Sequence, residues 1–69
     1  MYQRLYERIV EQCAVKGWSV AKTEREADVA NGIIGKLRNG EGITVVTIVK
    51  IAKALNVSVD YLLGITEEQ

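Results

Sequence analysis

Cys13 is the side chain of this sequence with the greatest nucleophilic potential. A cysteine reacts as a thiolate, which a neighbouring base or cation must stabilise. The sequence has one cysteine and no histidine, so it offers Cys13 no imidazole partner and offers a metal ion no pair of Cys or His ligands. We therefore predict no catalytic nucleophile, no metal site, no disulfide within the chain and no cofactor.

The carboxylates and glycines give no sign of an enzyme either. The acidic residues are scattered over predicted helix surfaces, without a nucleophile beside a plausible base. Gly40-Glu41-Gly42 lacks the lysine and the helix that follow the glycines of a phosphate-cradling loop. We expect that the protein is not an enzyme and that it binds no small-molecule ligand.

Trp18 carries a flat ring on which a nucleotide base could stack. A single tryptophan that follows a glycine at a helix junction is more often part of the core. We therefore expect Trp18 to pack in the core, and we expect Cys13 to lie on the buried face of the first helix.

The charges of this sequence balance, with nine basic and nine acidic residues. Nucleic-acid-binding domains are commonly basic, so a formal net charge of zero weighs against such a partner. The distribution is more favourable, because Glu67 and Glu68 lie near the end of the chain while basic residues gather in its middle. The residues in that middle segment are Lys16, Lys22, Arg25, Lys36 and Arg38, interspersed with Glu24, Glu26 and Asp28.

A length of 69 residues allows one domain, with a folded core over residues 1–64 and a frayed tail over residues 65–69. A single core of this size supplies only about 3–5 kcal/mol of net stability, so good helix packing or self-association must add to it. No export signal is recognisable, and the longest apolar-rich run, Ile43–Val49, is too short to cross a bilayer. We expect a cytoplasmic protein with no membrane partner.

Hydrophobic periodicity predicts an all-α protein of five short helices without strands. Apolar residues recur at steps of three and four in the first segment, which places them on one face of a helix. They are Tyr2, Leu5, Tyr6, Ile9, Val10 and Cys13. Lys16 and Gly17 can end this helix, because a cation favours the last turn and a glycine favours the position beyond it.

Hydroxyl side chains mark the starts of three later helices, since their oxygens accept from first-turn amides. Ser19 can cap a second helix, Thr44 a fourth and Ser58 a fifth. The predicted ranges are Val20–Ala27 for the second helix, Asn31–Asn39 for the third, a fourth that runs to Leu55 and ends at Asn56, and Val59–Leu63 for the fifth, which Gly64 closes. The fourth is apolar nearly all round, which predicts a central, well-buried helix.

Three segments resemble the lambda-repressor and Cro-like (Xre-type) helix-turn-helix family. Lys16-Gly17-Trp18-Ser19-Val20 is similar to the segment before the family's second helix, and Ile34-x-x-Leu37-x-Asn39-Gly40 is similar to the end of its recognition helix. The segment from Lys50 to Gly64 is the closest match and fixes the register. The sequence departs from the family at Asp28, where glycine is usual, at Ala30, where a capping Ser or Thr is usual, and at Thr23 and Ala27, where larger apolar residues are usual.

The resemblance implies a compact five-helix, repressor-like domain with the helix-turn-helix in its second and third helices. In that family the third helix lies in the major groove with its first residues at base edges. The corresponding positions here are Ala30, Asn31, Gly32, Ile33 and Lys36. Asn31 can bond bidentately to adenine, or it can simply cap the third helix.

The other residues of the third helix also have alternative roles. Lys36 can reach a guanine or a phosphate, or it can be an ordinary solvated lysine. Gly32 and Gly35 lie within the predicted helix, where each costs about 1 kcal/mol relative to alanine. Gly32 could instead allow the backbone to approach DNA closely, whereas we expect Gly35 to be merely tolerated.

By the same resemblance, phosphate contacts come from the start of the second helix and the end of the third. The candidates are Ser19, Val20, Lys22, Arg38 and Asn39, although Arg38 can instead pair with Glu11 or Glu41. The implied dimer surface consists of Val57, Ser58, Val59, Tyr61 and Leu62.

Two functions follow from these observations. One is a sequence-specific transcriptional regulator on double-stranded DNA, a phage- or prophage-type repressor that binds a palindromic operator as a homodimer. The other is a protein-interaction module that has the fold but weak or no DNA affinity, which the zero net charge favours.

Overall fold

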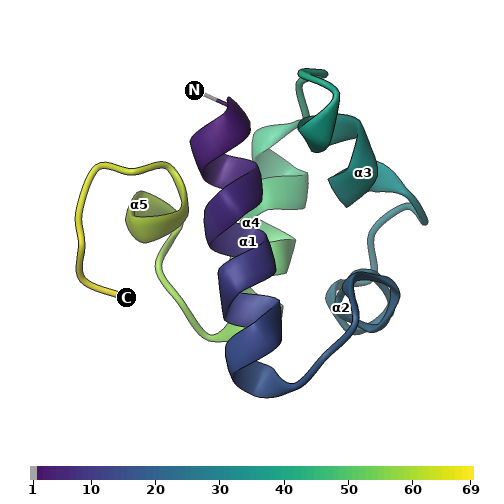
Figure 1. The fold of residues 1–69 in the computed structure, drawn as a ribbon, viewed down its shortest axis with the longest axis horizontal. Helices are drawn as coiled ribbons and strands as arrows, with labels where there is room; N and C mark the ends of the chain where they lie inside the picture. The colour runs from purple at the N-terminus through teal and green to yellow at the C-terminus, as the bar shows by residue number, and fades with distance from the viewer. Residues whose placement is uncertain (1) are drawn as a thin grey trace.

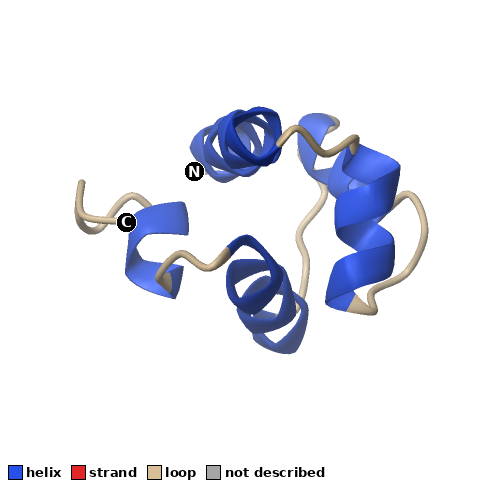
Figure 2. Cartoon of the chain, turned by 90° about the horizontal axis from the view of Figure 1, so that it is seen from below, coloured by secondary structure: helices blue, strands red, loops and turns tan. Residues whose placement is uncertain are grey.

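Five helices account for most of the chain. The computed structural model describes residues 2–69, with side chains from Arg4 onward, so the predicted core role of the Tyr2 side chain lies outside the described residues. The helices are α1 (Tyr2–Lys16), α2 (Val20–Ala27), α3 (Ile33–Arg38), α4 (Val45–Leu55) and α5 (Val59–Leu62). Residues 2–69 contain no strand (Figure 2), and the predicted all-α fold is confirmed.

Each of the three predicted hydroxyl caps is present. The side-chain oxygen accepts from the amide three residues later, which has no acceptor within its own helix. The oxygen-to-nitrogen distances are 3.0 Å for Ser19 and Lys22, 3.2 Å for Thr44 and Thr47, and 3.0 Å for Ser58 and Tyr61. These caps explain why α2, α4 and α5 begin where the sequence predicts.

Residues with positive φ end three of the helices. Gly17 follows α1 with φ of 70°, and the next amide, that of Trp18, donates to the Cys13 carbonyl at 2.9 Å. Asp28 and Asn56 end α2 and α4 in the left-handed region, with φ of 58° and 59°. Asp and Asn tolerate this region better than most residues because their short polar side chains bond locally. The left-handed conformation of Asp28 agrees with the family register, in which glycine is usual there.

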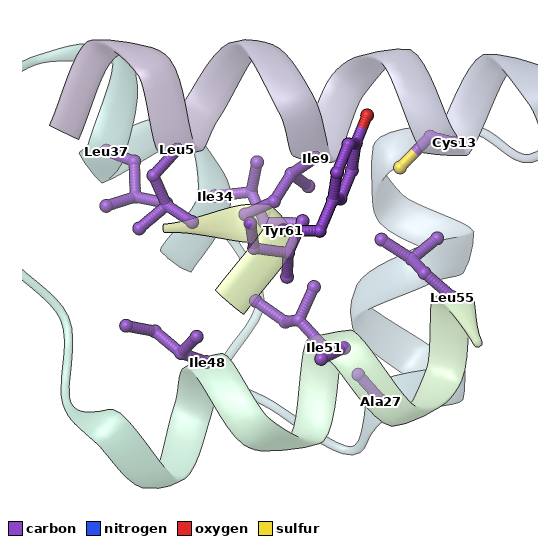
Figure 3. Close-up of a cluster of buried hydrophobic side chains, with 12 residues drawn as sticks. Leu5, Ile9, Cys13, Ala27, Ile34, Leu37, Ile48, Ile51, Leu55 and Tyr61 are labelled. Carbon is purple, nitrogen blue, oxygen red and sulfur yellow. The ribbon is translucent and has the colours of Figure 1, made fainter. Parts of the chain in front are cut away.

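α1 is the helix that contacts all of the others. It packs against each of the other helices, and Figure 1 shows α5 on one side of it and α2 and α3 on the other. All five helices contribute to one core, part of which Figure 3 shows. Its members are Leu5, Ile9, Cys13, Ala27, Ile34, Leu37, Ile48, Ile51, Ala52, Leu55, Tyr61 and Leu62. Trp18 is half-buried against this core, as predicted.

Thr23 puts a polar group into the core where the family usually has a larger apolar side chain. The residue is fully buried, and its hydroxyl donates to the Ser19 carbonyl at 3.1 Å. The same oxygen lies 3.0 Å from the sulfur of Cys13. Because these bonds satisfy the hydroxyl, its burial leaves no unpaired polar group. Cys13 is therefore a packing residue with a local partner.

α4 is less buried than predicted, because only one of its faces is in the core although its residues are apolar nearly all round. Its buried residues are Ile48, Ile51, Ala52 and Leu55. Val45 and Val46 in its first turn remain 71% and 65% exposed. α4 packs against α1, α2 and α5, and no other described helix covers that first turn.

The last five residues, for which the sequence predicts a frayed tail, make contacts with the rest of the domain. Arg8 is buried, and its guanidinium donates to the Thr66 carbonyl at 2.9 Å and to both carboxylate oxygens of Glu67 at 3.0 and 3.1 Å. The amide of Ser58 donates to the Gln69 carbonyl at 2.9 Å. Arg8, more than fifty residues away in sequence, and Ser58 therefore hold this segment in place.

Candidate nucleic-acid interface

The start of α2 presents backbone amides to solvent. Ser19 takes up the amide of Lys22, and the Thr23 amide donates to the Ser19 carbonyl at 3.0 Å. The amides of Val20 and Ala21 have no acceptor among the described residues. Unpaired amides and the positive end of the helix dipole together attract an anion such as a phosphate. Ser19 and Val20 thus have the local geometry that phosphate binding requires.

Two lysines gather beside this helix start through their contact with Trp18. The ammonium nitrogen of Lys16 lies 5.5 Å from the centroid of the indole ring, and that of Lys22 lies 5.6 Å from it. A cation over an aromatic face is stabilised by about 0.5–1 kcal/mol at an exposed site. Trp18 thus holds the positive charges of Lys16 and Lys22 next to the Ser19 cap. Lys16 is absent from the predicted phosphate contacts, and its position three residues before the cap was the available signal.

α3 begins at Ile33, two residues later than predicted. Ala30, Asn31 and Gly32 form the turn that leads into it, and the Ile33 amide donates to the Ala30 carbonyl at 3.2 Å. Gly32 occupies the position before the first helical residue with φ of 90°, a conformation that side chains disfavour. The predicted helix-interior cost of Gly32 therefore does not apply. Gly35 does lie within the helix, and a side-chain carbon there would meet nothing within 4 Å.

Asn31 does not cap α3, which removes the structural alternative for that residue. The position before α3 is held by Gly32, and no side chain of that position bonds to the helix. The Asn31 side chain is exposed and has no hydrogen-bond partner in the part of the chain that the structure describes. Its carboxamide is accordingly available to a ligand.

Glu24 supplies the missing cap, a role that sequence reasoning did not identify. Its carboxylate accepts from the amide of Gly32 through Oε1 and from that of Ile34 through Oε2, both at 3.0 Å. The residue is only 3% exposed and lies on the inner face of α2. An acidic residue at a helix N-terminus also interacts favourably with the dipole. No local pattern reveals this contact, because the carboxylate comes from the preceding helix.

The remaining predicted contacts lie along α3 and at its end. Ile34 and Leu37 are in the core, whereas Lys36, Arg38 and Asn39 are exposed. Ile33 is half-buried and packs against the core, so only part of its side chain faces outward. Arg38 makes none of its predicted ion pairs within residues 4–69. The outward face of α3 therefore carries Lys36 and the open Gly35 position.

The predicted dimer surface needs correction. Tyr61 and Leu62 are in the core of the single chain, and the Tyr61 hydroxyl accepts from the Gln12 side chain at 3.1 Å. Figure 3 shows the Tyr61 ring beside Ile9. Neither side chain can face a partner while the domain is folded. Val57 and Val59 are half-buried and Ser58 is exposed.

Two further apolar residues are exposed close to α5 in sequence. Leu63 and Ile65 are 36% and 71% exposed. An open pocket of about 390 Å³ lies elsewhere, between α1 and the last residues, and its lining includes Arg4, Arg8 and Glu67. No residue of α2 or α3 lines it, so it is separate from the candidate interface.

Comparison with known families agrees with this geometry. Residues 16–62 match the model of a helix-turn-helix family, and this span covers more than half of the chain. The protein belongs to the lambda-repressor and Cro-like (Xre-type) helix-turn-helix family, whose members are DNA-binding regulators. No curated protein and no solved structure matches the chain. No described helix has the length and apolar character to cross a membrane.

Proposed function

We propose that the protein is a sequence-specific transcriptional regulator of the phage-repressor type that binds a palindromic operator as a homodimer. The observation that carries the proposal is the division of the α2–α3 unit into two faces. Ile34 and Leu37 anchor α3 in the core, while Asn31 and Lys36 are exposed and have no partner among the residues that the structure describes. Exposed polar residues on a helix that the core anchors, and on the turn that leads into it, suit the reading of base edges.

Asn31 reads adenine in this proposal, because a carboxamide matches the N6 donor and N7 acceptor of that base. Lys36 contacts a guanine or a phosphate one turn further along. Ala30, Gly32 and Ile33 line the approach, and their small or partly buried side chains let the turn come close to the groove. These contacts determine specificity rather than most of the affinity.

Phosphate contacts supply most of the affinity. The amide of Val20, the Ser19 cap and Lys22 bind one phosphate region at the start of α2, and Arg38 and Asn39 bind another at the end of α3. The two regions flank the base-reading residues in the sequence. Such contacts fix the register of the domain on the duplex.

Homodimerisation uses the exposed part of the α5 region, which retains Val57, Ser58 and Val59 of the predicted surface. The exposure of Leu63 and Ile65 nearby supports an apolar contact there. A two-fold dimer of such domains binds half-sites about one helical turn apart, roughly 34 Å. The operator is therefore a palindrome with that spacing.

Selection of binding sites from random duplexes tests this function. We expect enrichment of a palindrome whose half-sites are separated by about one turn. Enrichment of a single half-site would contradict the dimer, and no enrichment would contradict sequence-specific binding.

A protein-interaction module is the second candidate, and the formal net charge of zero favours it. Glu26, Asp28 and Glu41 are exposed among the basic residues of the interface. Retention on random duplex DNA at increasing salt separates the two functions. Phosphate contacts give a steep fall of affinity with salt, whereas an interaction module would show little retention at any salt concentration.

A further inference from the structure

Glu24 is connected to the turn between α2 and α3 at three points. Its backbone carbonyl accepts from the amide of Val29 at 3.1 Å, just after the left-handed Asp28. Its carboxylate accepts from the amides of Gly32 and Ile34 at 3.0 Å each. One residue of α2 therefore holds the backbone on both sides of Ala30 and Asn31.

The surroundings of Glu24 make this connection rigid. The side chain is nearly fully buried, so water competes little for the carboxylate. Hydrogen bonds to a charged acceptor are stronger than those between neutral groups. The two bonds span the position before α3 and the second residue of that helix, and they set where α3 starts relative to α2.

We propose that Glu24 is a positioning residue for DNA recognition, which sets the register between the phosphate-binding start of α2 and the base-reading turn. This inference rests on the proposed function. Glu24 does not itself contact DNA, because its carboxylate is buried and occupied by two amides. Its effect reaches the bases through Asn31 and Lys36, whose positions depend on the start of α3.

The chain offers a conservative variant and a matched control. In Glu24→Gln the amide oxygen can accept from one of the two backbone amides, but the NH2 group cannot accept from the other. Glu26→Gln changes the charge by the same amount on the same helix, at an exposed residue without a partner among the described residues. Any effect that comes from charge alone must therefore appear in both variants.

The first measurement needs no DNA. Hydrogen exchange of the parent protein by NMR should show protected amides at Gly32 and Ile34 and an exposed, fast-exchanging amide at Asn31. In Glu24→Gln at least one of the protected amides should exchange faster and shift its resonance, at a temperature where both proteins are fully folded. Fast exchange at both Gly32 and Ile34 in the parent would contradict the two hydrogen bonds to the Glu24 carboxylate.

The second measurement compares two duplexes, the one enriched by site selection and a random duplex of equal length. Glu24→Gln should bind the enriched duplex about tenfold more weakly, the cost of one misplaced base contact, and bind the random duplex as well as the parent does. Glu26→Gln should change both affinities equally. Equal losses on both duplexes for Glu24→Gln, or no loss, would overturn the positioning role. A parent protein without sequence preference would overturn the proposed function and the positioning role with it. The hydrogen-exchange data would still show separately whether Glu24 bonds to the amides of Gly32 and Ile34.

Discussion

The guanidinium of Arg8 contacts Tyr61 twice, once over its ring and once at its backbone. The guanidinium carbon lies 4.5 Å from the ring centroid, and Nη1 donates to the Tyr61 carbonyl at 2.7 Å. The same group holds Thr66 and Glu67. A buried cation thereby joins α1 to α5 and to the last residues of the chain.

Replacing Arg8 should destabilise the domain strongly. Arg8→Met keeps much of the side-chain volume but removes the charged donor that the carbonyls of Tyr61 and Thr66 share, and the Tyr61 carbonyl keeps only the amide of Gly64 at 3.1 Å. We expect a loss of about 2–4 kcal/mol in the free energy of unfolding, since a hydrogen bond to a charged group contributes roughly 1.5–3 kcal/mol. Urea unfolding monitored by circular dichroism measures this loss. The control is Arg4→Met, because Arg4 lies on the surface and pairs with Glu67 at 3.6 Å; that change should stay within about 0.5 kcal/mol, and equal losses would contradict the role of Arg8.

Asp28→Gly should stabilise the domain slightly. Glycine removes a steric cost of order 1–2 kcal/mol at φ of 58°, and it adds about 0.4–1 kcal/mol of unfolded-chain entropy. The expected net gain is below about 1 kcal/mol, or a few degrees in the thermal midpoint. Asp28→Ala should be less stable than both, because alanine cannot bond locally. A thermal scan that ranks alanine equal to glycine would be inconsistent with the left-handed turn.

Lys36→Ala should weaken DNA binding in one of two distinguishable ways. If Lys36 contacts a base, specificity at one operator position relaxes at a cost of about 1–3 kcal/mol. If it contacts a phosphate, affinity falls equally for all sequences, and the salt slope decreases by about one. Fluorescence anisotropy at several salt concentrations measures both. Lys53→Ala on α4 removes the same charge outside α2 and α3 and should leave specificity unchanged; parent-like binding by Lys36→Ala would exclude Lys36 from the interface.

Leu63→Glu should weaken self-association without unfolding the chain. Leu63 is the better test position than Tyr61, because Tyr61→Glu would place a charge in the core and unfold the domain. Sedimentation velocity should show a shift from dimer toward monomer for Leu63→Glu. Val15→Glu, at an exposed residue near the end of α1, should leave the dimer intact. A parent protein that stays monomeric at high concentration would refute the proposed interface outright.

Local chemistry explains the parts of the fold that the sequence predicts correctly. Ser19, Thr44 and Ser58 each bond to an amide three residues away, and Asn56 ends α4 by its own backbone conformation. Each of these interactions joins groups that are at most a few residues apart in the sequence. A single sequence therefore contains all the information that they need.

The errors have the opposite origin. The start of α3 depends on Glu24, eight to ten residues earlier and on another helix. The position of the last five residues depends on Arg8, and the burial of Tyr61 depends on both Arg8 and Gln12. Periodicity cannot reveal such partners, because they meet only after the helices have packed. The sequence therefore predicts a set of candidate site residues but not how those residues are arranged in space.

The contacts of α1 with every other helix mean that residues 16–62 cannot be transferred to another protein on their own. The family match begins at Lys16, yet Leu5, Ile9 and Cys13 of α1 are core residues. Burial of a large apolar side chain contributes roughly 1.5–3 kcal/mol, which is comparable with the whole net stability of about 3–5 kcal/mol for a domain this small. If residues 16–62 were transferred to another scaffold without α1, the apolar side chains that pack against α1 would be exposed to water. A chimaeric protein that contains α2 and α3 must therefore also contain α1 or supply apolar side chains that replace those of α1 in the core.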